Sequence, residues 1–373
     1  PRRRLAATVG TTQSLFFIGE PWNLRVRQSG KKVAGLGARQ VLAFCVVMGL
    51  AQQSAGAEGQ APSGAAQQDF DSFKIVQAGG ARAAMDVAQA AEYLKDYDVI
   101  VIGEYHDHIA NHLAELALLR ALRERVPALA LSMEQFERDV QPVVDDYLAG
   151  RIGEATLKHD GRAWSNYDEA YRPLVEYARD HALPVIAANA PAALVRCVGQ
   201  KGAAFLQTLA AEKRGWAAAE IRTEDGPYNR KFLGLMNGDA AHGGVLSGAR
   251  AESSFAAQVT RDETMADSIA NFLHARPGAR VVHITGAFHA EDRLGTIERL
   301  QRRIPGIRIA VLLPLQAKLS DPAAIEKDRI KGADFLILLR QAPDPYASDK
   351  ERRAAEARQA SAFRTASGQG CKL

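Results

Sequence analysis

Short apolar runs recur along the chain from residue 98 and alternate with longer amphipathic segments. The runs are rich in Val, Ile and Leu and span residues 98–102, 129–133, 184–188, 281–285, 307–313 and 334–339. Near-continuous apolar runs without polar alternation are typical of strands buried on both faces. Helical spacing separates them, as at Leu113, Leu116, Ala117, Leu119 and Leu122. The pattern predicts an α/β fold, with a mostly parallel sheet and helices on both faces.

Three regions depart from this alternation. Residues from about 191 to 262 are too many for a simple crossover, which predicts a helical insertion whose Gly-rich end, 238–248, is a lid or a disordered loop. Thr260 and Glu263 precede an apolar stripe and have the spacing of a capping box, which places a helix start there. We expect a linker at 58–75, a folded domain at 76–342, and a disordered polar tail at 343–373.

The first 57 residues have the features of a targeting segment. Basic residues precede the apolar run 41–51, which is followed by the small residues 55–57 in an A-x-A arrangement. This order predicts an N-terminal extension plus a cleaved secretory signal peptide, and therefore a periplasmic or exported protein. The run is short for a membrane span, which needs about 20 residues. Residues 42–45 resemble a lipobox, so lipidation of Cys45 stays open as an alternative, although bulky Phe44 argues against it.

The charge balance changes the picture of possible partners. The whole chain has 47 basic and 43 acidic residues, and residues 1–57 hold eight and one of these, which leaves 39 and 42 in the remainder. The mature part is therefore slightly acidic, and nothing in its charge favours nucleic acid. Only Cys197 and Cys371 lie beyond the signal, which excludes a disulfide framework and a cysteine-based metal site.

Polar side chains gather where four of the predicted strands end. Glu104 and His106 follow the first strand, Glu134 the second, Asn189 the third and His289 the fourth. The carboxyl ends of parallel strands share one edge of the sheet, where ligands bind. We therefore expect these five side chains to form a site there.

Other polar and aromatic residues have two readings. His108 and His112 are one helical turn apart, and are either a divalent-metal pair or two solvated histidines. His283 lies inside a strand pattern and reads as a core histidine. The aromatic segment 164–171, WSNYDEAY, is a core stripe or part of a cofactor pocket.

Several motifs in order resemble the ChaN family of haem-binding proteins, which are associated with bacterial iron uptake and grouped with Tiki proteases and erythromycin esterases. The matching segments are GEYHDH with His112 downstream, MEQF at Glu134, WSNYDEAYRPLVEYA, the AAN ending at Asn189, QVTRDETMADSIA, and Gly-x-x-His ending at His289. They cover about residues 98–295. Two features depart from the family pattern: the lipobox is poor, and Ala287 and Phe288 replace the polar residues of a common GNGH motif.

The resemblance implies an exported protein of haem and iron uptake that binds ferric haem at the carboxyl edge of the sheet. It further implies a homodimer that shares haem, an outer-membrane haem receptor as partner, and a tyrosine ligand of the iron. Tyr171 is the first choice for that ligand and Tyr105 the second, with the five strand-end residues around the haem. A tyrosinate is a hard anionic donor that suits ferric iron, and helix N-termini at this edge suit the propionates.

The same strand ends suit a metal-dependent hydrolase. Glu104 or Glu134 is then the general base, while His106 and His289 bind a divalent metal ion or polarise a carbonyl. A structural interaction protein is a third reading, and it requires the polar strand ends to be coincidental. The sequence does not separate haem binding from hydrolysis, because both use the same residues.

Overall fold

The computed structural model describes residues 71–79, 84–238, 247–317, 331–341, 345–367 and 370–373. The predicted signal peptide with Cys45, most of the predicted linker, and the Gly-rich loop at 239–246 lie outside these residues. Within the described part of the chain, no helix is both long enough and apolar enough to cross a membrane.

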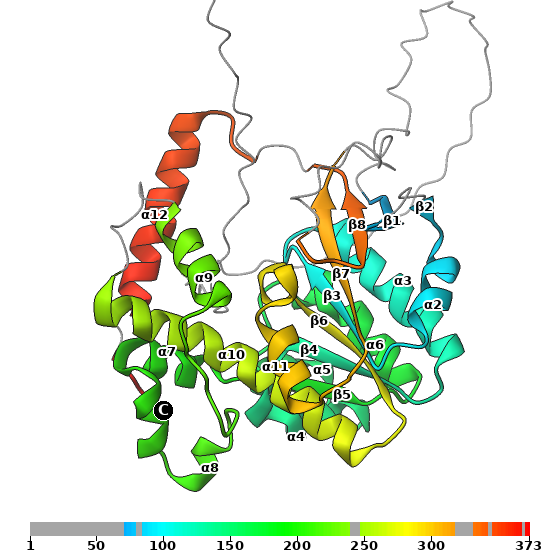
Figure 1. The fold of residues 1–373 in the computed structure, drawn as a ribbon, viewed down its shortest axis with the longest axis horizontal. Coiled ribbons are helices and arrows are strands. Elements are labelled where there is room, and N and C mark those ends of the chain that lie inside the picture. The colour runs from blue at the N-terminus through cyan, green and yellow to red at the C-terminus, as the bar shows by residue number, and fades with distance from the viewer. Residues whose placement is uncertain (1–70, 80–83, 239–246, 318–330, 342–344, 368–369) are drawn as a thin grey trace, which may run out of the picture.

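A mixed, mostly parallel sheet forms the centre of the molecule (Figure 1). Its described strands run in the order β2-β1-β8-β7-β3-β6-β4-β5. Neighbours from β8 to β5 are parallel, while β1 pairs antiparallel with both β8 and β2. The bounds are β1 (Phe73–Gln77), β2 (Ala84–Met85), β3 (Val99–Glu104), β4 (Leu129–Glu137), β5 (Val185–Asn189), β6 (Arg280–Gly286), β7 (Ile309–Gln316) and β8 (Phe335–Leu339).

The predicted α/β class with a mostly parallel sheet is confirmed, and all six predicted strands are present. The two antiparallel strands β1 and β2 were not predicted. β1 begins at Phe73, so the linker ends at residue 72 or earlier, at least three residues before its predicted end at residue 75. The reason is that β1 has a single buried pair, Ile75 and Val76, which is too short to stand out as an apolar run.

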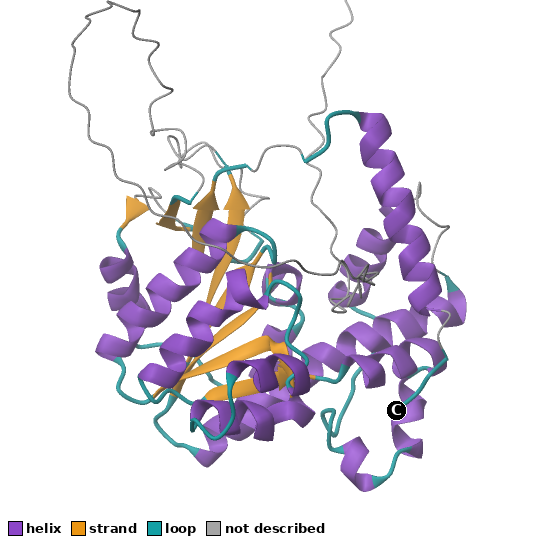
Figure 2. Ribbon diagram, turned by 180° about the vertical axis from the view of Figure 1, so that it is seen from behind, coloured by secondary structure: helices purple, strands orange, loops and turns teal. Residues whose placement is uncertain are grey.

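Helices cover both faces of the sheet (Figure 2). On one face pack α2 (Val87–Leu94), α3 (Ile109–Arg125), α4 (Gln141–Leu148), α5 (Glu154–Asp160) and α6 (Arg172–Asp180); on the other pack α10 (Gly248–Ala275) and α11 (Thr296–Arg303). Strand side chains alternate between the two cores: Ile100 and Ile102 face the first, and Val99 and Val101 the second. Because both faces are covered, β3 has no exposed residue, which explains its unbroken apolar sequence.

Short helical turns connect these elements. Their bounds are η1 (Arg138–Val140), η2 (Tyr167–Tyr171), η3 (Ala203–Thr208), η5 (Ala287–His289) and η6 (Glu291–Arg293). The η2 segment is a π-helical turn, a rare form that often occurs at functional sites.

The insertion is helical, but its predicted end is wrong. It contains α7 (Ala192–Lys201), α8 (Ala211–Arg214) and α9 (Pro227–Gly238), and α10 continues without a break from Gly248 to Ala275. No boundary therefore falls at residue 262, and no helix starts at the expected capping box. Inside α10, the Thr260 hydroxyl donates to the carbonyl oxygen of Ala256 at 2.7 Å, a back-bond within the helix.

The tail from residue 343 contains structure that the sequence did not predict. Residues Asp349–Ser367 form α12, which lies with the insertion helices and away from the sheet in both views (Figures 1 and 2). Cys371 then forms a disulfide with Cys197 of α7, 174 residues earlier. The tail has few large apolar residues, so its composition alone predicted disorder. The disulfide bond instead attaches the end of the tail to α7.

Replacing Cys197 with serine is expected to lower the free energy of unfolding by about 2–4 kcal/mol, because the cross-link closes a long loop of the unfolded chain. Urea unfolding of oxidised wild type, Cys197→Ser, Cys371→Ser and the double variant measures this. Each single variant should lose as much as the double variant. A double variant that loses the sum of both singles would show that the two cysteines act separately.

Candidate functional site

The carboxyl ends of β3, β4 and β6 bring the predicted strand-end residues together. In the parallel pairing of β3 with β6, Glu104 lies opposite Gly286, three residues before His289. Glu134 projects from β4, which pairs with the other side of β6. Glu104, Glu134 and His289 are buried, and His106 retains 24% exposure of its side chain. Two hydrogen-bonded networks result, one around each glutamate.

Glu104 is the centre of the first network. Its Oε1 accepts hydrogen bonds from His106 Nδ1 at 2.6 Å, Gln135 Nε2 at 2.7 Å and the Tyr171 hydroxyl at 2.8 Å. Its Oε2 lies 3.4 Å from His112 Nδ1 and is buried without a hydrogen-bond donor among the described residues. A carboxylate only accepts hydrogen bonds, so His106 carries its proton on Nδ1 and directs that proton at Glu104.

Glu134 and Asp262 hold His289 in the second network. Glu134 Oε2 accepts from the Thr285 hydroxyl at 2.7 Å and from the backbone N–H of Gly286 at 2.8 Å, and its Oε1 lies 3.4 Å from His289 Nε2. On the other side, His289 Nδ1 donates to Asp262 Oδ1 at 2.8 Å. Both nitrogens of this imidazole therefore face carboxylates.

The absence of a side chain at Gly286 lets the two networks approach each other. A Cβ atom on Gly286 would lie 2.9 Å from His106 Nε2 and 3.0 Å from His106 Cε1, closer than real Cβ atoms come. The His106 ring thus passes directly over the backbone that carries Glu134's hydrogen bond. Any larger residue at 286 would displace this imidazole.

Mutual charge compensation shifts the pKa values of both networks. Burial alone lowers the pKa of His289, but the charges of Glu134 and Asp262 outweigh burial and raise it to about 10. Burial raises the pKa of Glu134, yet His289 and His106 bring it well below its ordinary value. The pKa of His106 is raised in the same way, against burial, by its bond to Glu104 and by Glu134. The pKa of Glu104 is also lowered against burial by His106, so Glu104, Glu134 and the His289 imidazolium are charged at neutral pH.

Tyr171 lies inside the Glu104 network. The π-helical turn η2 ends at this residue and directs its hydroxyl at Glu104, and the ring stacks edge-on against His112 with centroids 5.2 Å apart. The side chain is fully buried. Burial, together with Glu104 and Glu115, raises the pKa of the phenol well above 10. In this conformation Tyr171 is a neutral hydrogen-bond donor.

A third group of polar residues enters from the first turns of α3. His112 Nδ1 lies 3.1 Å from Glu115 Oε2, and His112 Nε2 donates to the backbone carbonyl of His106 at 2.9 Å. Asn111 Nδ2 donates to Glu115 Oε1 at 2.9 Å. Burial lowers the pKa of His112, but Glu115 and Glu104 raise it to about 9; burial and Glu104 raise the pKa of Glu115 to about 7.

The structure places other predicted residues outside these networks. The Tyr105 hydroxyl donates to the carbonyl oxygen of Pro314 at 3.2 Å, and Asn189 accepts from the backbone N–H of Ala190. His108 contacts the carbonyl oxygen of Arg340, so it does not form a metal pair with His112. The prediction of His283 as a core histidine is confirmed: it is buried, contacts Ser132, and burial lowers its pKa to about 4.

Sequence reasoning missed four members of the site. Gln135 directly follows the predicted Glu134, and Asp262 was assigned to a helix cap. Glu115 and Asn111 lie on the inward face of α3, where the predicted stripe placed Leu113; Leu113 is instead 39% exposed. The available signal was a run of three polar residues at helical spacing, 111, 112 and 115, at the start of an otherwise apolar helix.

One aromatic side chain contacts His106, and two exposed apolar residues follow it in the sequence. Trp164 stacks edge-on against its ring with centroids 5.0 Å apart. Ile109, 43% exposed, and Leu113 lie on the first turns of α3, which begins three residues after His106. Exposed large apolar residues beside a polar group are typical of a surface that binds a ligand or a partner.

The free energy of unfolding is expected to fall as pH rises from about 6.5 to about 10, because the folded chain keeps the His289 proton that the unfolded chain releases. One such group contributes a slope of at most about 1.4 kcal/mol per pH unit. Urea unfolding of wild type and His289→Gln across this range measures the effect. The variant should be less stable at pH 7 and lose less stability at pH 10; an unchanged slope would contradict the assignment.

A family profile matches residues 90–300 of this chain, and its description is "Haem-binding uptake, Tiki superfamily, ChaN". Among curated proteins, the chain is 27% identical over 214 residues to Protein RETICULATA-RELATED 5, chloroplastic, of Arabidopsis thaliana. That match covers 52% of this chain and 28% of the plant protein, so the chain spans little more than a quarter of the length of this relative.

One solved structure with a TM-score above 0.5 shares the fold. The structure titled "Cofacial heme binding to ChaN of Campylobacter jejuni" superposes with a TM-score of 0.55 at 13% identity, over 72% of this chain and 97% of that one. An erythromycin esterase in its open conformation has a TM-score of 0.40 at 13% identity, over 77% of this chain and 87% of its own.

Proposed function

Because this chain belongs to the ChaN family of haem-binding uptake proteins in the Tiki superfamily, we propose that it binds ferric haem at the carboxyl edge of its sheet, through His106. One observation carries the choice of residue. His106 is the partly exposed imidazole of the networks, its Nδ1 is held by Glu104, and among the described residues none contacts its Nε2 with a hydrogen bond. Nε2 lies close to the backbone of Gly286 and is the proposed donor atom for iron.

The chemistry of the Glu104–His106 pair suits ferric haem. Haem iron is commonly held by an imidazole, and a carboxylate behind that imidazole raises its basicity and fixes its orientation. Bound haem supplies an iron centre that accepts this nitrogen. The chain supplies the oriented imidazole, and Trp164, Ile109 and Leu113 supply apolar surface for the porphyrin.

This proposal changes the role of Tyr171. The sequence favours Tyr171 as the iron ligand, but its hydroxyl is buried and donates to Glu104. A tyrosinate there would face two carboxylates, which is why its pKa is raised so far. We assign Tyr171 to positioning Glu104, and Tyr105 remains the second candidate for a tyrosine ligand.

The surroundings of His106 favour haem shared between two copies of the chain. The similar structure from Campylobacter jejuni is a ChaN protein with cofacial haem binding. Here the exposed side chains of Ile109 and Leu113 would be covered by a second copy that meets the haem from the other side. We also propose export, from the leader in residues 1–57, and a role in haem uptake; the outer-membrane receptor stays a prediction.

The hydrogen-bonded Glu104–His106 pair also favours a second candidate function, hydrolysis. A carboxylate-oriented imidazole with an accessible Nε2 is a general base. In that reading the pair activates water for attack on an ester or amide. The buried His289 cannot do so, since Glu134 and Asp262 face both of its nitrogens.

Titration of the purified chain with ferric haem should give a saturable shift of the Soret band, and His106→Ala should abolish this shift or weaken binding by about 100-fold. Tyr171→Phe should retain the wild-type spectrum, because it removes only one of the three donors to Glu104. His289→Gln is the matched histidine control. Circular dichroism checks that every variant folds.

The outcomes separate the alternatives. Loss of the spectrum in Tyr171→Phe or Tyr105→Phe, with His106→Ala unchanged, would return the ligand role to tyrosine. A wild-type chain with no Soret shift, whose ester hydrolysis disappears in Glu104→Gln, would establish the hydrolase instead.

A further inference from the structure

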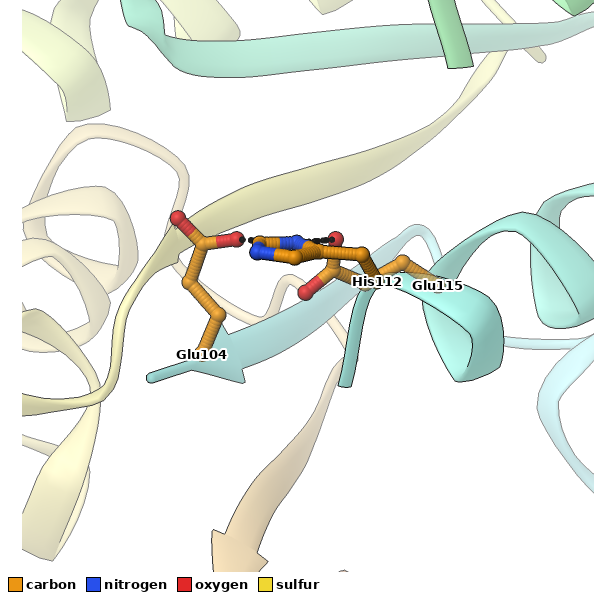
Figure 3. Close-up of side chains that lie close together, drawn as sticks. All are labelled: Glu104, His112 and Glu115. Atoms are coloured by element: carbon orange, nitrogen blue, oxygen red, sulfur yellow. Dashed lines mark hydrogen bonds and ion pairs between the residues drawn. The ribbon is translucent and has the colours of Figure 1, made fainter. Parts of the chain in front are cut away.

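We propose that Glu104, His112 and Glu115 form a binding site for a divalent transition-metal ion such as Zn²⁺, behind the proposed haem ligand. Figure 3 shows the three side chains converging, with the imidazole between the carboxylates. Their donor atoms all lie within 4.8 Å of one another, and the three residues are buried. The site joins the end of β3 to the first turns of α3.

Two of the three donor separations are close to the spacing of metal ligands, and the third is at most 4.8 Å. His112 Nδ1 lies 3.1 Å from Glu115 Oε2 and 3.4 Å from Glu104 Oε2. Zinc binds nitrogen and carboxylate oxygen at about 2.0–2.2 Å, which separates neighbouring tetrahedral ligands by roughly 3.3–3.5 Å. An imidazole with two carboxylates is also a donor set that zinc accepts.

The surrounding hydrogen bonds orient each donor. His112 Nε2 donates to the carbonyl oxygen of His106, which leaves the lone pair on Nδ1 when the ring is neutral. Asn111 holds Glu115 Oε1, so that Oε2 faces the imidazole. The three donors on Glu104 all contact Oε1 and leave Oε2 for the site. Such outer partners fix ligands in metal sites.

An independent observation points to a missing partner. Glu104 is 2% exposed, and its Oε2 is buried without a hydrogen-bond donor among the described residues. A buried charged acceptor without a hydrogen-bond donor is unfavourable. A metal ion that contacts Oε2 would remove this cost, and its two charges would balance both carboxylates beside a neutral His112.

Protons are the alternative source of compensation. A proton on His112 and another on Glu115 would also balance the charge. Metal binding must then displace these protons, so zinc affinity should fall as the pH is lowered. The inference does not depend on haem binding, because His106 contacts the other oxygen of Glu104.

The test is the zinc content of the purified full chain after dialysis against micromolar Zn²⁺ and removal of unbound metal. Wild type should retain about one Zn²⁺ per chain, and Zn²⁺ should raise the melting temperature. Glu115→Gln should weaken zinc binding by about 100-fold or more while keeping an oxygen for the Asn111 bond. Glu263→Gln removes a buried carboxylate of α10 that pairs with arginines outside the site; it is the matched control and should retain the metal.

Zinc-edge X-ray absorption on wild type gives a measurement that does not depend on variants. It should show nitrogen and oxygen ligands near 2.0 Å with one imidazole. Two imidazoles would place the metal at His106 and His289 and overturn the inference. So would a wild-type chain that retains no zinc, or equal zinc in wild type and Glu115→Gln. These results leave the Soret titration unaffected, so failure of one proposal is distinguishable from failure of the other.

Discussion

Charge balance between buried carboxylates is the constraint on which the site depends. Glu104 and Glu134 are carried to the carboxyl edge by strands whose other residues are buried, except Glu137 at the end of β4. Burying an unpaired carboxylate costs on the order of several kcal/mol, so the fold must supply partners. It does so from elements far apart in sequence: the η2 turn, the start of α3, the middle of α10 and the loop after β6. The networks thus fix how these elements pack, and not only what the site binds.

The two Gly-x-x-His segments show how burial gives similar sequences different properties. Gly103 and Gly286 lie on paired parallel strands, one residue out of register, and each is followed three residues later by a histidine. At His289, carboxylates face both nitrogens of the ring and keep the imidazolium charged at neutral pH. At His106, a carboxylate holds one nitrogen and the side chain keeps 24% exposure. The first histidine is therefore the more exposed of the two, while the second acts as a buried charge.

Much of the fold could be predicted because its signals are local. Strands buried on both faces produce apolar runs, and the polar residues after them mark the functional edge. Predictions failed where tertiary contacts override local pattern. The predicted buried stripe of α3 included Leu113. In the structure, the buried positions at the start of α3 are polar and include His112, which lies close to Glu104. Asp262 was read as part of a cap, yet α10 continues through it because His289 requires a buried carboxylate at that point. The tail has too few large apolar residues for its sequence to predict a helix. In the structure, a disulfide bond attaches this tail to α7.

The position of Glu104 connects the haem and metal proposals through one carboxylate. Its Oε1 accepts from His106 and its Oε2 faces His112 and Glu115. A metal ion on Oε2 would withdraw electron density from the Glu104 carboxylate and weaken its hydrogen bond to the His106 proton. Protons on His112 and Glu115 would have the same effect, but a weaker one, because they place less positive charge at Oε2. The basicity of the His106 imidazole, and with it the preference for ferric iron, would then vary with the occupant of the inner site. A buried carboxylate with two inequivalent oxygens is sufficient for such coupling, without any movement of the backbone.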